Sequence, residues 1–369
     1  MNSLGGEEKN ILLWLGIGNN ESAWAEYLSG AAKVLLLQRG LVRQHSIWEK
    51  NKRTFASPSI KLGRWRAFDD LFLNLPSALK YVWLTLRHAP PGPADLLVVE
   101  VGRGWAALLL RGLGRVRKVV SLQSDYLPPR GHLPLRMHRR LVLALNQFIV
   151  RHADEVWRVS PRIPLGLEHP RNFVIPLFID DNQIPLGDRR RLVYIGNPTP
   201  DHALDYLFEI ARKHGLPLDI FGESPYLDSL RAQAPAETRF HGYQTDREKI
   251  AAVLKDCFCG YAVYKNVSET SYSYYGIPSK SFHYLANNVP VLTTNTAHFS
   301  QTIEKEGIGR VVEPQFAEVE AAILELRAEP KKFYDAIVGF RDRWNAGARQ
   351  FLDERLAALF SDSDRRRQP

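Results

Sequence analysis

Residues 257–264 read Cys-Phe-Cys-Gly-Tyr-Ala-Val-Tyr, and residues 275–291 read Tyr-Gly-Ile-Pro-Ser-Lys-Ser-Phe-His-Tyr-Leu-Ala-Asn-Asn-Val-Pro-Val, followed by Leu-Thr-Thr. The first run is typical of a buried strand, because it is short, apolar and bounded by polar segments. In the second, the Pro-Ser-Lys turn predicts a short helix over residues 281–286, and the Asn-Asn break predicts its end before an apolar strand at 289–293. Strand, helix and strand in this order are the repeating unit of a parallel sheet.

The same alternation extends in both directions from this unit. Further strands and helices of the second half are predicted at residues 191–196, 202–214, 218–222, 238–242 and 246–255. Strands of the first half are predicted at residues 10–18, 33–38, 95–101, 118–125, 154–160 and 173–176. The strands read as continuous apolar runs, as parallel strands covered on both faces require. The pattern predicts an α/β protein of two Rossmann-like domains, with its site at strand carboxyl ends in a cleft between them.

A polar linker that contains Pro and Gly, residues 179–187, separates the two halves. At 369 residues the chain is long enough for about two domains. We therefore expect an N-terminal domain over residues 1–178 and a C-terminal domain over residues 188–340. Two helical stretches are predicted between residues 331 and 360, the second forming a C-terminal helix at 341–361, and the charged tail 362–369 is expected to be disordered.

The composition is that of a globular protein, with 45% hydrophobic and 24% charged residues. A net charge of +9 indicates an anionic partner, and nucleotide phosphates, membrane lipid and nucleic acid all fit it. Cys257 and Cys259 cannot complete a zinc site and are expected to be reduced core thiols of a cytosolic protein. We expect no signal peptide, since the first residues lack a basic segment, and no spanning helix, since every window of about 18 residues carries charges.

The Pro-Ser-Lys turn ahead of residues 281–286 is a candidate phosphate site. Unpaired amide groups and the positive end of a helix dipole favour an anion at a helix N-terminus, and Lys280 adds a charge able to reach a diphosphate. The alternative is an ordinary loop with a solvated lysine. Glycines at strand ends, in Gly18-Asn19 and Gly196-Asn197, let a ligand approach the backbone, but neither pair forms the complete dinucleotide fingerprint.

In the order of its elements, nearly the whole chain resembles the GT-B glycosyltransferases, enzymes of two facing Rossmann-like domains with an interdomain cleft. It is most similar to the GumK-type, the membrane-associated glucuronosyltransferases of xanthan synthesis. In that family an aromatic-ended strand, a Ser/Met-Lys turn and the following helix hold the nucleotide diphosphate. The resemblance implies a donor site for a UDP- or GDP-sugar made of Tyr264, Ser279, Lys280, His283, Gly196, Asn197, Gly222 and Glu223. It also places acceptor contacts at Gly18 and Asn19.

His283 is a departure from part of that family. Many retaining GT-B enzymes have a glutamate there, seven residues before the proline of the Val-Pro-Val strand, to hold the ribose. Histidine can still form a hydrogen bond with a hydroxyl group. The alternative for His283 is a helix residue that packs under its own loop.

The stretch Lys-Val-Val-Ser-Leu-Gln-Ser-Asp, residues 118–125, resembles the strand end that supplies the catalytic base in the same enzymes. Asp125 would take the proton of an acceptor hydroxyl, and a single base with attack from the opposite face gives inversion. The alternative is a turn or cap aspartate ahead of Pro128. Glu100 is a second, weaker candidate for the base. No metal or cofactor is expected, because the Asp-Ser-Asp at 362–364 lies in the charged tail without a strand beneath it. No covalent nucleophile is expected either, because the sequence has no Gly-x-Ser-x-Gly elbow.

Residues 61–88 mix aromatic and basic side chains, and a second basic cluster follows at 130–140. The mixture suits a membrane interface, but a helix packed on its own sheet has the same pattern. The sequence therefore predicts a glycosyltransferase that acts on a membrane-linked glycan, cytoplasmic or peripheral on the inner face of the plasma membrane. The alternatives are a phage-type enzyme that glycosylates DNA bases, so that nucleic acid stays a possible partner, and a non-catalytic module that binds sugar nucleotides.

Overall fold

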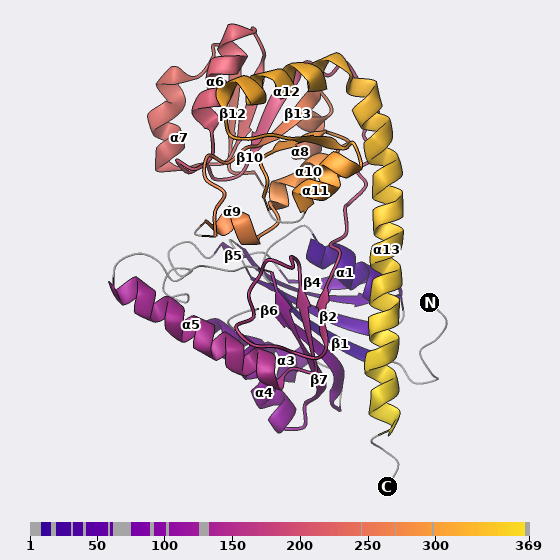
Figure 1. The fold of residues 1–369 in the computed structure, drawn as a ribbon. Helices are drawn as coiled ribbons and strands as arrows, with labels where there is room; N and C mark the ends of the chain where they lie inside the picture. Colours follow the sequence, from indigo (N-terminus) through magenta and orange to yellow (C-terminus); the bar gives the residue numbers. More distant parts are fainter. Residues whose placement is uncertain are drawn as a thin grey trace. The chain divides into compact units, whose positions relative to one another are not determined.

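The computed structural model describes residues 9–15, 20–30, 32–39, 42–57, 60–61, 75–88, 92–100, 103–124, 133–244, 246–269, 271–296 and 299–365 (Figure 1). The chain divides into two units. The first unit contains Met1–Phe178 together with Ala346–Pro369, and the second contains Ile179–Asn345. The last helix therefore contributes to both units, whereas the sequence analysis treated residues 341–361 as a separate helix.

The first unit is built on one sheet with the strand order β4-β3-β2-β1-β6-β7-β8-β9, and β5 pairs with β3. Six of its strands are parallel and lie where the apolar runs predicted them: β1 (Lys9–Leu15), β2 (Ala32–Arg39), β6 (Ala94–Glu100), β7 (Val116–Gln123), β8 (Glu155–Arg158) and β9 (Asn172–Val174). Four of these, β1, β2, β6 and β7, are almost wholly buried at their described side chains. This agrees with the continuous apolar pattern.

An antiparallel extension of this sheet was not predicted. It consists of β3 (Val42–Glu49), β4 (Lys52–Ala56) and β5 (Ile60–Lys61). Lys50 and Asn51 join β3 to β4 with positive φ angles of 51° and 60°, the geometry of a tight hairpin turn. Every residue of β4 is exposed, so this edge strand has no apolar run by which its sequence could be recognised.

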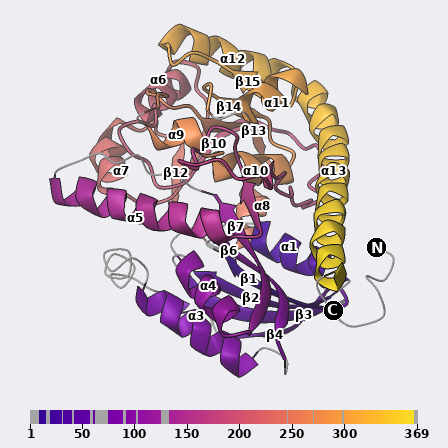
Figure 2. The ribbon, with the colours of Figure 1, turned by 60° about the horizontal axis from the view of Figure 1, so that its bottom comes forward.

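Helices cover both faces of the first sheet (Figure 2). One face carries α3 (Leu75–His88), α4 (Gly104–Gly112) and α5 (Leu133–His152), which lie side by side in that order. The other face carries α1 (Asn20–Leu28) and the last turns of α13 (Pro330–Arg365). On that face Trp157 of β8 contacts Trp24 of α1 and Phe351 of α13, with ring centroids 5.8 and 6.4 Å apart.

Helix α13 corrects two expectations. The two helical stretches predicted after residue 330 form a single helix of 36 residues. The helix also continues to Arg365, four residues into the stretch expected to be disordered. Its buried side chains Ala348, Leu352, Leu356 and Leu359 recur at intervals of three and four, so one apolar stripe continues along it.

The second unit is built on a parallel sheet with the order β12-β11-β10-β13-β14-β15. Its strands are β10 (Arg191–Ile195), β11 (Leu218–Phe221), β12 (Thr238–Gly242), β13 (Cys257–Ala262), β14 (Val291–Thr293) and the unpredicted β15 (Gly309–Val311). Its helices are α6 (Leu204–Lys213), α7 (Pro225–Leu230), α8 (Arg247–Leu254), α9 (Tyr272–Tyr275), α10 (Ser279–Ala286), α11 (Phe299–Lys305), α12 (Phe316–Ala328) and the start of α13. The predicted helix after the Pro-Ser-Lys turn is α10, which begins two residues earlier than expected.

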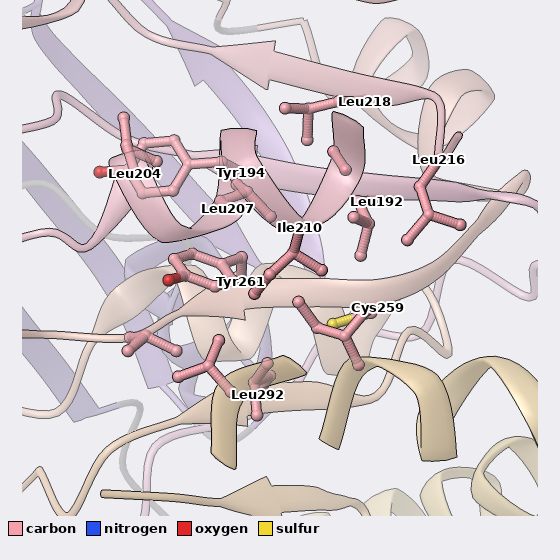
Figure 3. Close-up of a cluster of buried hydrophobic side chains, with 14 of the residues drawn as sticks. Leu192, Tyr194, Leu204, Leu207, Ile210, Leu216, Leu218, Cys259, Tyr261 and Leu292 are labelled. Atoms are coloured by element: carbon pink, nitrogen blue, oxygen red, sulfur yellow. The ribbon is translucent and has the colours of Figure 1, made fainter. Parts of the chain in front are cut away.

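The core of the second unit lies between the central strands and α6 (Figure 3). Leu192 and Tyr194 of β10 pack with Cys259 and Tyr261 of β13. Both cysteines are buried free thiols, and burial raises the pKa of each, as expected for core residues.

Tyr284 of α10 joins the carboxyl ends of β10 and β13. Its fully buried hydroxyl accepts a hydrogen bond from the backbone N–H of Ile195 and donates one to the carbonyl of Tyr261, both at 3.0 Å. The same ring contacts Gly260, where an added Cβ would lie 2.3 Å from a ring carbon. The hydroxyl therefore satisfies two backbone groups where the strand ends.

Tyr284→Phe is expected to lower the free energy of unfolding by about 1–3 kcal/mol, because it leaves a buried N–H without an acceptor. Chemical denaturation measures the change. Tyr275→Phe is the matched control, since its hydroxyl donates to the exposed carbonyl of Glu269 at 2.8 Å and should contribute less than about 1 kcal/mol. Equal effects for the two variants would contradict the role given to Tyr284.

Candidate functional site

Two glycines bring the backbone together at the carboxyl ends of β10 and β11. Gly196 and Gly222 have φ angles of 128° and 123°. Residues other than glycine rarely adopt such angles. A Cβ on Gly222 would lie 1.8 Å from the carbonyl oxygen of Gly196. Only glycine fits at this contact, because the backbone of Gly196 fills the place that a side chain of Gly222 would take, so the two strand ends form one packed backbone surface.

Lys280 lies beside this surface. It is the second residue of α10, and its side chain is buried, with 8% exposed. A Cβ on Gly196 would be 3.6 Å from Lys280 Cε and 3.8 Å from Nζ. The ammonium donates to the hydroxyl of Tyr194 at 3.3 Å and lies over the rings of Tyr194 and Tyr264, at 4.4 and 5.1 Å from their centroids.

The charge of Lys280 is not matched by a carboxylate among the residues that the structure describes. Burial lowers the pKa of Lys280 to about 7, because the ammonium loses its hydration. A buried cation at the N-terminus of a helix, where amide groups already favour an anion, is electrostatically incomplete. An anion bound at this place would offset the charge of Lys280.

Helix α10 leaves further donors at its N-terminus. Its N-cap, Pro278, makes no side-chain hydrogen bond to the helix. The buried hydroxyl of Ser281 has no hydrogen-bond partner among the described residues. Ser279 is exposed at the first position of the helix. Exposed or orphaned donors of this kind can be satisfied by phosphate oxygens.

His202 extends the aromatic wall around the lysine. Its ring centroid lies 4.8 Å from that of Tyr264 and 5.7 Å from that of Tyr194. Burial, and then the charge of Lys280, lower the pKa of His202 to about 3, so the ring is neutral at physiological pH. The N–H of Thr199 donates to Nδ1 at 2.9 Å, which leaves the ring proton on Nε2 as a hydrogen-bond donor.

The other residues predicted to bind the sugar nucleotide lie after the ends of β10 and β11 and on helix α10. Asn197 and Glu223 follow the glycines, and the N–H of Glu223 donates to Asn197 Oδ1 at 3.3 Å. Glu223 Oε1 also accepts from the N–H of Tyr243. His283 lies one turn beyond Lys280, where burial and then the charge of Arg247 on α8 lower its pKa to about 4. The structure thus joins Lys280, Tyr264 and Gly196, and links Asn197, Gly222 and Glu223 to the same strand ends.

In the first unit, Glu100 ends β6 and is held by two partners. Arg103 Nη2 donates to its carboxylate at 3.1 Å, and the hydroxyl of Ser124 donates to the other oxygen. Arg103 itself is buried, and its Nη1 donates to the carbonyl of Leu15 at 3.4 Å. Glu100 thus lies within a network that ties together the ends of β1, β6 and β7.

Three predicted site residues lie outside the described residues: Asp125, Gly18 and Asn19. Ser124, which precedes Asp125, is described and contacts Glu100. No group of three or more His, Cys, Asp or Glu side chains that could hold a metal ion occurs within the described ranges. Within the same ranges, no helix is long and apolar enough to cross a membrane.

Three further residues of these sites, Tyr194, His202 and Arg103, were not predicted from the sequence. Tyr194 is two residues before a strand-end glycine, a position that could have marked it as a site residue. His202 follows the polar turn after β10 and precedes α6, where ligand contacts are common in such sheets. Arg103 had no signal beyond its place three residues after Glu100.

The second unit is similar in sequence to a known family of domains. A family model described as "Glucosyltransferase 3-like, C-terminal domain" matches residues 192–347, which is nearly all of the second unit. No curated protein matches the chain significantly.

Several solved structures share the fold over almost the whole chain. Sucrose-phosphate synthase from Thermosynechococcus elongatus is 16% identical, with 96% of this chain and 100% of that one covered and a TM-score of 0.65. HepE of Anabaena, in complex with UDP and glucose, is 13% identical, with 95% and 100% covered and a TM-score of 0.64. The lipopolysaccharide outer core galactosyltransferase WaaB is 13% identical, with 96% and 99% covered and a TM-score of 0.56. The chain has the GT-B fold of these glycosyltransferases, as the sequence predicted.

Proposed function

We propose that the protein is a glycosyltransferase that takes a sugar from a nucleoside diphosphate donor bound at the strand ends of the second unit. The observation that carries the proposal is Lys280, a buried cation at a helix N-terminus beside two glycines of positive φ, with no carboxylate partner among the described residues. The match of residues 192–347 to a glucosyltransferase-like domain and the GT-B fold support it.

A nucleoside diphosphate fits these groups. Gly196, which has no side chain, lets phosphate oxygens approach the backbone beside Lys280, and Lys280 with the first amides of α10 compensates their charge. The neutral His202 and the hydroxyl of Tyr194 add hydrogen-bonding groups next to the lysine. Because these groups supply the compensation, we propose that binding of the diphosphate needs no divalent metal ion.

The chemistry is an exchange at the anomeric carbon of the donor sugar. An acceptor hydroxyl attacks that carbon, the bond to the diphosphate oxygen breaks, and the leaving diphosphate keeps the electron pair. The positive groups around Lys280 stabilise this leaving group. We propose Asp125 as the base that takes the hydroxyl proton, with Glu100 as the alternative, and attack from the opposite face gives an inverted product.

The acceptor is proposed to be a membrane-linked glycan, as in the GumK-type enzymes that the sequence resembles. The net charge of +9 supports an enzyme that works at an anionic membrane surface on the cytoplasmic side. A DNA-base glycosyltransferase is the second candidate, because the same charge suits nucleic acid.

A non-catalytic GT-B module that binds sugar nucleotides is the third candidate. Slow hydrolysis of a UDP- or GDP-sugar, with release of the nucleoside diphosphate in the absence of acceptor, separates an enzyme from such a module. Tight nucleotide binding without any turnover in the presence of membrane or DNA acceptors would favour the module.

We expect UDP or GDP to bind, and the affinity to fall as the pH rises above about 7.5. Lys280 has a pKa of about 7 in the free protein and must be protonated to pair with the diphosphate, so binding takes up a proton. Above that pKa, each pH unit should weaken binding by up to about tenfold until the pKa of the complex is reached. Calorimetry at about pH 7.5, 8.5 and 9.5 measures the change in affinity.

Lys280→Met is the control for this pH profile, since its remaining affinity should not change over the same range. A wild-type affinity that is independent of pH would mean that Lys280 does not contact the diphosphate. Failure of both UDP and GDP to bind at any pH would remove the proposed donor site altogether.

A further inference from the structure

Apolar side chains are exposed on one helical layer of the first unit. Among the described residues, twelve large hydrophobic side chains are exposed, and eight of them belong to α3, to α4 with its C-cap, or to α5. These eight are Leu79, Trp83, Leu86, Leu109, Leu113, Met137, Leu141 and Phe148. Exposed fractions run from 48% at Leu109 to 63% at Leu113. Single exposed apolar residues need no explanation, but a concentration on three adjacent helices does.

The spacing places these residues on the outer side of each helix. In α3 they recur at intervals of four and three, in α4 at four, and in α5 at four and seven, which all return to one side of an α-helix. The inner sides are occupied by core residues such as Tyr81, Leu110 and Ile149, which are at most 1% exposed. Since α3, α4 and α5 lie side by side on the same face of the sheet, their outer sides form one surface.

This surface carries positive charge and no negative charge from its own helices. The sequences of α3, α4 and α5 contain neither Asp nor Glu. Among the Lys and Arg residues of these helices whose side chains the structure describes, Arg87, Arg140 and Arg151 are exposed, and Lys80, Arg111 and Arg139 are partly exposed. The guanidinium of Arg87 lies over the exposed Trp83 ring at 5.1 Å, so a cation and an aromatic ring are presented together. Arg111 is partly neutralised by Asp154 at 3.2 Å.

We propose that the outer surface of α3, α4 and α5 is a docking surface for an anionic lipid bilayer, an inference that rests on the proposed function at a membrane. Leu, Met, Phe and Trp side chains enter the boundary between headgroups and acyl chains, and the Lys and Arg side chains beside them pair with lipid phosphates. The three helices lie on the bilayer and do not cross it.

The composition of the surface favours a bilayer over the other anionic partner. A protein face that binds duplex DNA is dominated by polar and basic contacts to phosphates and base edges, and eight exposed large apolar side chains have no partner there. A second copy of the chain would have to place one predominantly basic surface against another, which costs electrostatic repulsion.

The surface differs from the one that the sequence alone suggested. The pattern of residues 61–88 suits a membrane interface or a helix packed on its own sheet, and Tyr81 fits the second description, since it lies in the core with its ring centroid 5.6 Å from that of Trp14. Trp65, Phe68 and Phe72 of that stretch lie outside the described residues. The sequence did not predict that α4 and the exposed leucines of α3 and α5 are parts of this surface.

The test is partitioning onto vesicles of phosphatidylcholine and phosphatidylglycerol, measured by co-sedimentation. The wild-type chain should bind them, less so in high salt, and should bind pure phosphatidylcholine weakly. The double variant Trp83→Gln and Leu141→Gln keeps helix-forming residues and should lower the partition coefficient by at least about tenfold. Phe55→Thr is the matched control, an exposed aromatic beside basic residues on β4, and should bind within about twofold of wild type.

Trp83 provides a second readout. Brominated lipids in the same vesicles should quench part of the tryptophan fluorescence of the wild-type chain, and Trp83→Phe should lose that part while still binding. Thermal melting and UDP affinity should be the same for all these variants, so a loss of binding is not a loss of fold, and the proposed donor site is tested separately.

Three results would overturn the proposal. The first is that wild-type protein ignores anionic vesicles at low salt. The second is that the double variant and Phe55→Thr lose binding equally. The third is that Trp83 and Leu141 are instead needed for duplex-DNA binding or for a dimer seen by light scattering, with no effect of vesicles.

Discussion

Asp125→Asn is expected to lower the rate of sugar transfer by about 10²–10⁴-fold, the usual contribution of a positioned base. The amide keeps the size and hydrogen-bonding capacity of the carboxylate but cannot take a proton at neutral pH. Affinity for UDP or GDP should stay within about twofold of wild type, because the diphosphate is held by groups of the second unit. Initial rates with a UDP- or GDP-sugar and a membrane-linked acceptor measure the first effect, and calorimetry measures the second.

Glu100→Gln is the matched control for Asp125→Asn. Glu100 is already bound by Arg103 and Ser124, so its replacement should act mainly on the stability of the strand ends. If Asp125→Asn turns over normally and Glu100→Gln does not, the two roles are exchanged. If Asp125→Asn melts early, Asp125 is a turn or cap residue. A product that retains the anomeric configuration would exclude the single-base mechanism even if the variant were inactive.

Lys280→Met is expected to weaken nucleotide binding and to stabilise the empty protein. Loss of charge-assisted contacts to the diphosphate should weaken UDP binding by about 1.5–3 kcal/mol, or roughly tenfold to more than a hundredfold. At the same time the melting temperature at pH 6 should rise, because methionine fills the same space without a buried charge.

The sign of the stability effect follows from the pKa of Lys280. Its folded value of about 7 lies below the ordinary value of 10.5, so between these values the unfolded chain binds the additional proton. The contribution of Lys280 to wild-type stability should therefore become more favourable as the pH rises from about 7 to 10.5, and the stability difference from Lys280→Met should be largest below pH 7 and shrink above it. A depression of one pKa unit corresponds to about 1.4 kcal/mol. A variant that melts lower than wild type and still binds UDP would identify Lys280 as a structural residue.

The parallel strands could be predicted from sequence because their burial on both faces is visible as continuous apolar runs, as in residues 95–100 and 192–195. The antiparallel edge could not, since β4 is exposed at every residue and carries no such run. The helical periodicity of α3 distinguishes the buried Tyr81 from the exposed Trp83. Ala78, Tyr81 and Leu84 recur at intervals of three and therefore share the buried side of the helix.

The candidate donor site could be predicted only in part. Lys280 was found from its place at a helix start, and the strand-end glycines were found from their place after apolar runs. The burial of the lysine could not be foreseen, because it depends on Tyr194 and Tyr264, which are brought to it by the pairing of β10 with β13 and by the packing of α10. The sequence separation of 86 residues between Lys280 and Tyr194 carries no local signal.

The division of the chain has a consequence for the order in which the units can form during synthesis. The second unit is continuous, from Ile179 to Asn345, so its core is complete once that stretch has left the ribosome. The first unit is begun earlier but closed last, because Phe351, Leu352 and Leu356 of α13 cover the sheet face that carries Trp157. Until those residues emerge, one apolar sheet face of the nascent first unit stays exposed to solvent. The unit that is synthesised first is therefore the last to bury its core.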